Sequence, residues 1–205
     1  MLMKFQHTHR SIVRSIRQVA LVKDWLALRG SFTLPLIRDY EPNARAGDVD
    51  DMLLSQIVHE KGRMRMLCKR AGHRAETAHG GPLHGRYLDE CMEPTMLTAI
   101  RPLWDACVQN LLPIYSIAPS SDCNGCPVTL EKLYLPFSRD GRTPDYLLVS
   151  LHAVSTEGRF VLEGVLKQNA DRAPMHWAVI IDPAMSLQPA ARRDTASTSD
   201  DFVFV

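Results

Sequence analysis

Cys123 and Cys126 form a C-x-x-C pair and are the first candidates for chemistry in this chain. A thioredoxin-like redox pair lies at a helix N-terminus, which lowers the thiol pKa, whereas a structural zinc ion takes four ligands. This pair lies between two expected strands, Pro127 follows it directly, and no second cysteine pair completes a zinc set. We therefore interpret the pair as structural, and we retain thiol redox chemistry as a weaker alternative.

Three histidines, His73, His79 and His84, fall within one loop-rich stretch and are candidate metal ligands. The Gly-Gly-Pro run at residues 80–82 separates them irregularly, so we predict no metal site. The sequence also lacks a Ser-His-Asp order, a phosphate-binding loop and a paired-carboxylate pattern. We predict no catalytic residue and a protein that is not an enzyme.

Large aromatic side chains with a few polar neighbours are typical of small-molecule sites. In the alternative interpretation, these aromatic rings fill the core of the protein. The six side chains that we predict to form a ligand site are His84, Arg86, Tyr87, Trp104, Tyr115 and Tyr134.

Composition excludes several classes of protein. The 205 residues carry a net charge of +1, with 45% apolar and 23% charged residues, so no overall field attracts nucleic acid. No apolar run is long enough to predict a membrane span, and the N-terminus does not resemble a signal peptide. The odd count of five cysteines argues against a disulfide framework and favours a cytoplasmic location.

The first expected element is an amphipathic helix over residues 8–29, with Thr8 as its N-cap. We predict that this helix packs on its own domain, with dimerisation or contact with an anionic surface as alternatives. Its apolar stripe consists of Ile12, Ile16, Val19, Val22 and Leu26.

The middle of the chain predicts a sheet with helices. A hairpin over residues 52–67 reverses at Gly62, and a helix over residues 94–111 contains Pro102, which should kink or split it. Residues 113–154 predict three consecutive antiparallel strands, joined at Asp140-Gly141, with one apolar and one solvated face in the second strand. Residues 160–166 predict a strand or short helix, and residues 176–181 a final strand.

Three segments resemble an atypical PAS-domain subfamily of small, stand-alone alphaproteobacterial proteins. They are residues 24–42 (DWLALRGSFTLPLIRDYEP), 80–90 (GGPLHGRYLDE) and 130–145 (LEKLYLPFSRDGRTPD), and the resemblance covers roughly residues 20–155. It implies an α+β fold: a PAS-like antiparallel sheet with helices on one face, enclosing a small pocket, plus the N-terminal helix. We expect three parts: residues 1–30, the helix; 31–183, the PAS-like domain; and 184–205, a flexible tail whose apolar end is a candidate docking segment.

The resemblance implies a sensor or regulatory protein that binds a small molecule, a partner protein or both, and that signals through its N-terminal helix. A homodimer is one candidate assembly, and an interaction module with a self-filled core is the main alternative function. The cofactor is unknown, because residues 96–111 hold no axial histidine for haem and the surroundings of Cys91 do not match the flavin-binding motif.

Overall fold

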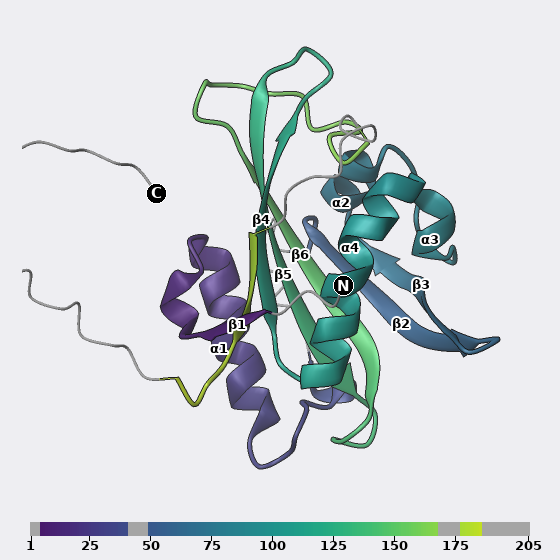
Figure 1. Cartoon of the computed structure of the whole chain (residues 1–205), viewed down its shortest axis with the longest axis vertical. Coiled ribbons are helices and arrows are strands. Elements are labelled where there is room, and N and C mark those ends of the chain that lie inside the picture. The colour runs from purple at the N-terminus through teal and green to yellow at the C-terminus, as the bar shows by residue number, and fades with distance from the viewer. Residues whose placement is uncertain (1–4, 41–48, 168–176, 186–205) are drawn as a thin grey trace, which may run out of the picture.

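The computed structural model describes residues 5–40, 49–167 and 177–185. One seven-stranded sheet forms its centre, and helices cover both faces of the sheet (Figure 1). Helix α1 lies on one face, and α2, α3 and α4 lie on the other. The predicted α+β class is confirmed. The expectation of helices on one face describes α2–α4, and α1 adds a third layer on the opposite face.

The elements have the following bounds. The helices are α1 (Ile16–Arg29), α2 (His73–His79), α3 (Leu88–Cys91) and α4 (Pro94–Asn110), with short 3-10 turns η1 (Arg10–Ile12) and η2 (Ile37–Asp39). The strands are β1 (Gln6–Thr8), β2 (Met52–Glu60), β3 (Arg63–Ala71), β4 (Ile114–Ser121), β5 (Pro127–Ser138), β6 (Pro144–Val154) and β7 (Trp177–Ile181).

The sheet combines a hairpin with a meander. Its strand order is β1-β7-β4-β5-β6-β2-β3, so the β2–β3 hairpin joins the β4–β5–β6 meander through the β2–β6 pair. Both units match the sequence prediction, including the reversal at Gly62, which has a positive φ of 75°. The expectation of a wholly antiparallel sheet is wrong at one edge, because β1 runs parallel to β7.

The beginning of the chain differs from the predicted helix over residues 8–29. Thr8 ends strand β1 instead of capping a helix, and Ser15 occupies the N-cap position of α1. The apolar stripe is also wrong in part, because Ile16 is 87% exposed whereas Gln18 and Trp25 are buried. Tertiary contacts overrode the apolar periodicity here, since backbone carbonyls of the sheet provide partners for polar atoms on the buried face of α1.

Helix α1 docks on the sheet through specific polar contacts as well as apolar packing. The Gln18 Nε2 group donates to the carbonyls of Glu131 (3.2 Å) and Ser150 (3.0 Å). The Trp25 indole N–H donates to the carbonyl of Pro136 at 2.7 Å. These bonds satisfy buried donors and orient α1 across β5 and β6. The predicted packing of this helix on its own domain is confirmed.

Helix α4 forms the main cover of the opposite face. Pro94 occupies its first turn, where a missing N–H costs nothing. Pro102 lies inside the helix without splitting it, contrary to one of the two predicted outcomes. Residues 160–166 form an irregular segment followed by turns rather than the expected strand or short helix, whereas the predicted final strand is β7.

The expected tail at residues 184–205 falls outside the described residues beyond Met185, so its docking role stays a prediction. Within the described part of the chain, no helix is long and apolar enough to cross a membrane.

Candidate functional site

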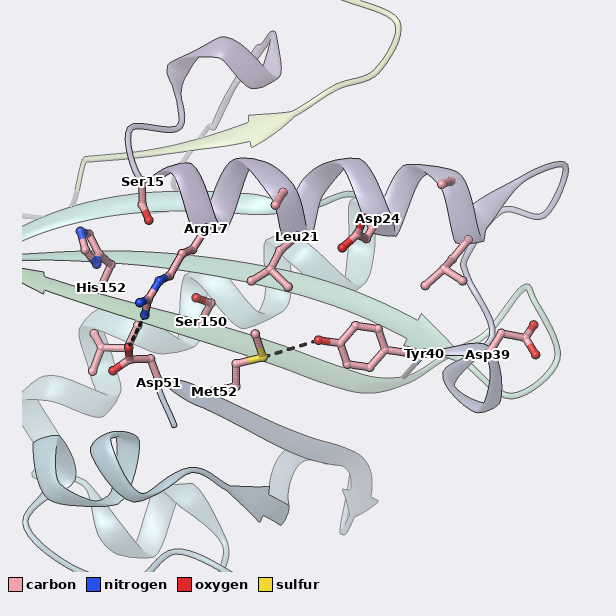
Figure 2. Close-up of a pocket in the computed structure, with 14 residues that line it drawn as sticks. Ser15, Arg17, Leu21, Asp24, Asp39, Tyr40, Asp51, Met52, Ser150 and His152 are labelled. Carbon is pink, nitrogen blue, oxygen red and sulfur yellow. Dashed lines mark hydrogen bonds and ion pairs between the residues drawn. The ribbon is translucent and has the colours of Figure 1, made fainter. Parts of the chain in front are cut away.

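An open cleft of about 410 Å³ lies between α1 and the sheet (Figure 2). Its volume falls within the range of small-molecule pockets, about 300–1,000 Å³. Helix α1 contributes one face of residues at three- and four-residue spacing, and η2, β2 and β6 contribute the opposite wall. The lining residues are Ser15, Arg17, Ala20, Leu21, Asp24, Ala27, Leu28, Asp39, Tyr40, Asp51, Met52, Ser150, Leu151 and His152.

One polar contact crosses this cleft near one end, and a second lies within the opposite wall near the other end. Arg17 reaches from α1 toward Asp51, with Nη1 and Oδ2 3.7 Å apart, and the Tyr40 hydroxyl donates to the Met52 sulfur at 3.5 Å (Figure 2). Between these contacts the α1 side chains face open space. The helix is therefore firmly packed along one stripe and loosely packed along the next.

A second, smaller hollow lies on the other face of the sheet. It has a volume of about 30 Å³, enough for one or two water-sized groups. Strands β2, β5 and β6 form its floor, and α2, α3 and α4 form its roof. It is lined by Asp51, Leu53, Ala75, His79, Leu88, Met92, Ile100, Trp104, Lys132, Tyr134, Val149, Leu151 and Leu166. We call this hollow the core cavity.

Lys132 is the unusual residue of the core cavity. Successive side chains of a strand alternate between faces, so Lys132 and Tyr134 point toward α2–α4 while Glu131 points toward α1. Lys132 is only 5% exposed and makes no hydrogen bond or ion pair with any described residue. Burial lowers the pKa of Lys132 to about 8. The predicted solvated face of this strand is therefore wrong, because helices cover both faces.

Two hydroxyl groups beside Lys132 are buried next to each other. The Tyr134 and Ser116 hydroxyl oxygens interact with one another, and neither has a further hydrogen-bond partner within the described ranges. Ser116 lies directly opposite Lys132 across the β4–β5 pair. Burial raises the pKa of Tyr134, so its phenol stays protonated and can donate. A buried polar group that lacks a partner costs about 1–3 kcal/mol, so two hydroxyls with only each other as partners, beside an unpaired Lys132, are a candidate for ligand binding.

His79 adds a polar group without adding charge. Its Nδ1 lies 2.8 Å from the carbonyl of Ala75, which assigns the proton to Nδ1 and leaves Nε2 as an acceptor. Burial lowers the pKa of His79 to about 4, and the nearby Lys132 acts in the same direction. The imidazole is therefore neutral at pH 7.

Asp51 connects the two hollows. Asp51 and Leu151 line both the cleft and the core cavity. The Asp51 carboxylate accepts a bond of 2.8 Å from the Arg74 Nε group of α2 and lies 3.7 Å from Arg17 of α1. Its backbone carbonyl accepts from the N–H of Leu151 in β6. One residue thus contacts helices on both faces of the sheet.

The six side chains predicted to form a ligand site do not gather in one place. Trp104 and Tyr134 line the core cavity. Tyr115 faces α1 instead, where its hydroxyl donates to Glu131 Oε2 at 2.8 Å.

The other three predicted side chains lie beside strand β3, away from both hollows. The His84 Nδ1 lies 2.8 Å from the carbonyl of Lys69, and the carbonyl of Arg86 accepts from the N–H of Cys68. The Tyr87 hydroxyl donates to Glu60, and the Arg65 guanidinium stacks 3.7 Å from the Tyr87 ring centre. These contacts hold residues 84–87 against the β2–β3 hairpin.

Sequence reasoning missed Lys132 and Asp51, and it considered His79 only as a metal ligand. A signal for Lys132 was present, because Leu130, Lys132 and Tyr134 alternate on one face of a strand flanked on both sides by other strands. A charged residue between two apolar ones on a central strand indicates a buried charge. Asp51 carried no comparable signal, since its two arginine partners come from separate helices.

The C-x-x-C pair lies in the β4–β5 turn. The Asp122 carboxylate accepts from the N–H groups of Asn124 and Cys126 (2.8 Å each) and of Val161 (2.8 Å). These bonds lower the pKa of Asp122, with Val161 contributing most. The turn is therefore held by an aspartate and lacks the helix that activates a redox thiol.

No group of three or more His, Cys, Asp or Glu side chains with metal-binding geometry occurs among the residues that the structure describes. In comparisons with known proteins, no family model, no curated protein and no solved structure matches the chain.

Proposed function

We propose that this chain is a non-enzymatic, PAS-like regulatory protein that binds a small molecule in the core cavity and signals through α1. The order of elements supports this proposal: a hairpin, short helices, one longer helix and a three-strand meander. This is the order that the PAS resemblance implies. The cavity between the sheet and the helices supplies a place for a ligand.

The observation that carries the proposal is the position of Asp51. Its carboxylate contacts Arg74 of α2 and Arg17 of α1, and it borders both the core cavity and the cleft. A ligand that displaces Asp51 or Leu151 would change the contacts that hold α1. Because one side of α1 faces the open cleft, the helix can shift without losing its whole interface. A ligand that prefers one packing of α1 would change the population of that packing.

The experiment compares the protein with and without its bound molecule. Native mass spectrometry of gently purified protein is compared with its denatured mass, and hydrogen exchange of α1 is measured before and after stripping by unfolding and refolding. We expect extra mass in the native protein and faster exchange in α1 after stripping. A native mass equal to that of the chain, with α1 exchange unchanged by stripping, would refute the proposal.

A matched pair of variants tests whether Asp51 couples the core cavity to α1. Asp51→Asn removes the charge shared by Arg17 and Arg74, and it should abolish the difference in α1 exchange while leaving the bound mass in place. Glu60→Gln removes another carboxylate of an arginine pair, at the far end of β2, and should leave the difference unaltered. Equal effects of the two variants would show that Asp51 does not couple ligand binding to α1.

The interaction module with a self-filled core is the second candidate, and one observation favours it. Side chains leave only about 30 Å³ in the core cavity, while Ile16 on α1 is 87% exposed. If Ile16 lies in a homodimer interface, Ile16→Asp should convert a dimer to a monomer in sedimentation, whereas Val161→Asp should not. A monomeric wild-type protein would exclude the homodimer.

A further inference from the structure

Lys132 lines the core cavity, and no described residue provides a counter-ion for its positive charge. Lys132 is buried, and no carboxylate among the described residues pairs with it. Asp51, the acidic residue lining the cavity, is bonded to Arg74 at 2.8 Å. Glu131, the neighbour in sequence, points to the opposite face and accepts from Tyr115. A buried ammonium is normally paired, because the loss of hydration must be compensated.

Apart from the neutral His79 and the Asp51 carboxylate, which Arg74 already pairs, the groups around this charge are donors and apolar walls. The Tyr134 hydroxyl is buried, has only the neighbouring Ser116 hydroxyl as a partner among the described residues, and lines the same cavity. Trp104, Ile100 and Leu53 provide apolar surface opposite. An ammonium and a phenol can both donate to one carboxylate, and charge-assisted bonds of this kind are the strongest that side chains form. Apolar walls beside such donors suit a short alkyl chain.

We propose that Lys132 and Tyr134 bind the carboxylate of a short aliphatic monocarboxylic acid in the core cavity. This inference rests on the proposed function and adds the chemical class of the ligand. The volume of about 30 Å³ has room for one or two water-sized groups, so only the smallest acids, formate and, with movement of side chains, acetate, match its size. Larger anions such as phosphate esters exceed this space.

A route to the surface adjoins the cavity. A smaller hollow shares His79, Met92, Ile100 and Leu166 with the core cavity and continues to Glu93 and Lys167. Methionine side chains rearrange easily because they are unbranched and flexible. Movement of Met92 and of Met96, which lines the smaller hollow, would open the cavity to an entering acid.

The titratable groups facing Lys132 make the pH dependence simple. They are Tyr134 on its own strand, His79 on α2 and Asp51 before β2, while α4 presents Ile100 and Trp104. The pKa of His79 is about 4 and burial raises the pKa of Tyr134, so neither residue titrates between pH 7 and pH 9. The pKa of Lys132 is about 8, and carboxylate binding needs its charged form. The apparent affinity should therefore fall about tenfold between pH 7 and pH 9.

The test is thermal unfolding of the full chain, stripped by refolding, in sodium acetate and sodium formate against sodium chloride at equal ionic strength. We expect a saturable rise in Tm with both acids, since a ligand of the folded state stabilises it. Lys132→Met should weaken the apparent affinity at least tenfold, and Tyr134→Phe by about two- to tenfold, the usual range for one hydrogen bond. Lys69→Met, the same change at an exposed site, should have no effect.

The inference would be overturned if acetate and formate caused no rise in Tm, or if they raised the Tm of wild type and Lys132→Met equally. Lys132→Gln, which keeps a polar side chain, provides the same comparison if Lys132→Met does not fold. Failure here is distinguishable from failure of the proposed function. A bound mass that is not a carboxylic acid, with α1 exchange still responsive, would overturn the ligand class alone. Carboxylate binding without any change in α1 exchange would instead overturn the signalling role.

Discussion

Replacing Lys132 with methionine should stabilise the ligand-free protein, although the residue lies in the core. Burial lowers the pKa of Lys132 from 10.5 to about 8, with desolvation as the sole cause. One pKa unit corresponds to about 1.4 kcal/mol, so keeping the charge buried costs about 3 kcal/mol. Methionine has a similar shape and no charge, and replacing an uncompensated buried charge with an apolar side chain removes that cost.

The stability difference between wild type and Lys132→Met should depend on pH, and its direction tests the reasoning. Below pH 8 Lys132 is charged in both the folded and unfolded states, so the full cost is present. Between pH 8 and pH 10.5 the folded state loses the proton while the unfolded state keeps it, and wild-type stability rises relative to the variant. The advantage of Lys132→Met should thus be about 3 kcal/mol at pH 7 and should vanish near pH 10.5.

Urea unfolding of both proteins at pH 7 and pH 10, in a buffer free of carboxylic acids, measures this difference. With a slope of about 2 kcal/mol/M, the midpoint of the variant should lie about 1.5 M higher at pH 7. The difference between the two proteins cancels the titration of groups that they share, and Lys69→Met controls for loss of a surface charge. A variant that is less stable than wild type at pH 7, or an advantage at pH 10 as large as that at pH 7, would refute the reasoning.

Two further predictions concern the contacts that hold the fold. Trp25→Phe should lower the unfolding free energy by about 1–3 kcal/mol, because it leaves the buried Pro136 carbonyl without its 2.7 Å hydrogen bond. The control Trp177→Phe, at a 45% exposed site, should change the unfolding free energy by less than about 0.5 kcal/mol. Equal urea midpoints for the two variants would contradict the role of the Trp25 hydrogen bond. Asp140→Ala should lower the urea midpoint at pH 7, because Asp140 accepts from the N–H groups of Thr143 and Arg142. These hydrogen bonds and that of Ser138 hold the pKa of Asp140 far below its usual value. The stabilisation of the folded state by Asp140 is therefore present above about pH 4 and should fade as the pH falls below that. An equal loss of stability in Asp39→Ala would argue against a specific role of the Asp140 hydrogen bonds.

Several elements could be predicted because their signals are local. The Gly62 reversal between two alternating segments predicted the β2–β3 hairpin, and the spacing of apolar residues after Pro94 predicted α4. The Asp140-Gly141 turn marked the end of β5 within the meander. Each of these patterns reflects interactions between residues close in sequence, and such interactions need no knowledge of the rest of the fold.

The candidate site was predicted only in part. Trp104 and Tyr134 were identified as large aromatic residues, and both line the core cavity. Tyr115 was selected by the same criterion, yet strand alternation places it on the opposite face, where it bonds Glu131. Residue type alone does not distinguish the two faces of a strand that is buried on both sides.

The sequence by itself determined the α+β class, the hairpin, the meander and the long helix. Only the tertiary structure decided which stripe of α1 is buried, that Lys132 has no counter-ion within the described residues, and that Asp51 borders both hollows. The physical reason is the range of the interactions. Gln18 is buried because it reaches carbonyls more than a hundred residues away, and burial of Lys132 depends on helices covering a face that local alternation predicted to be solvated.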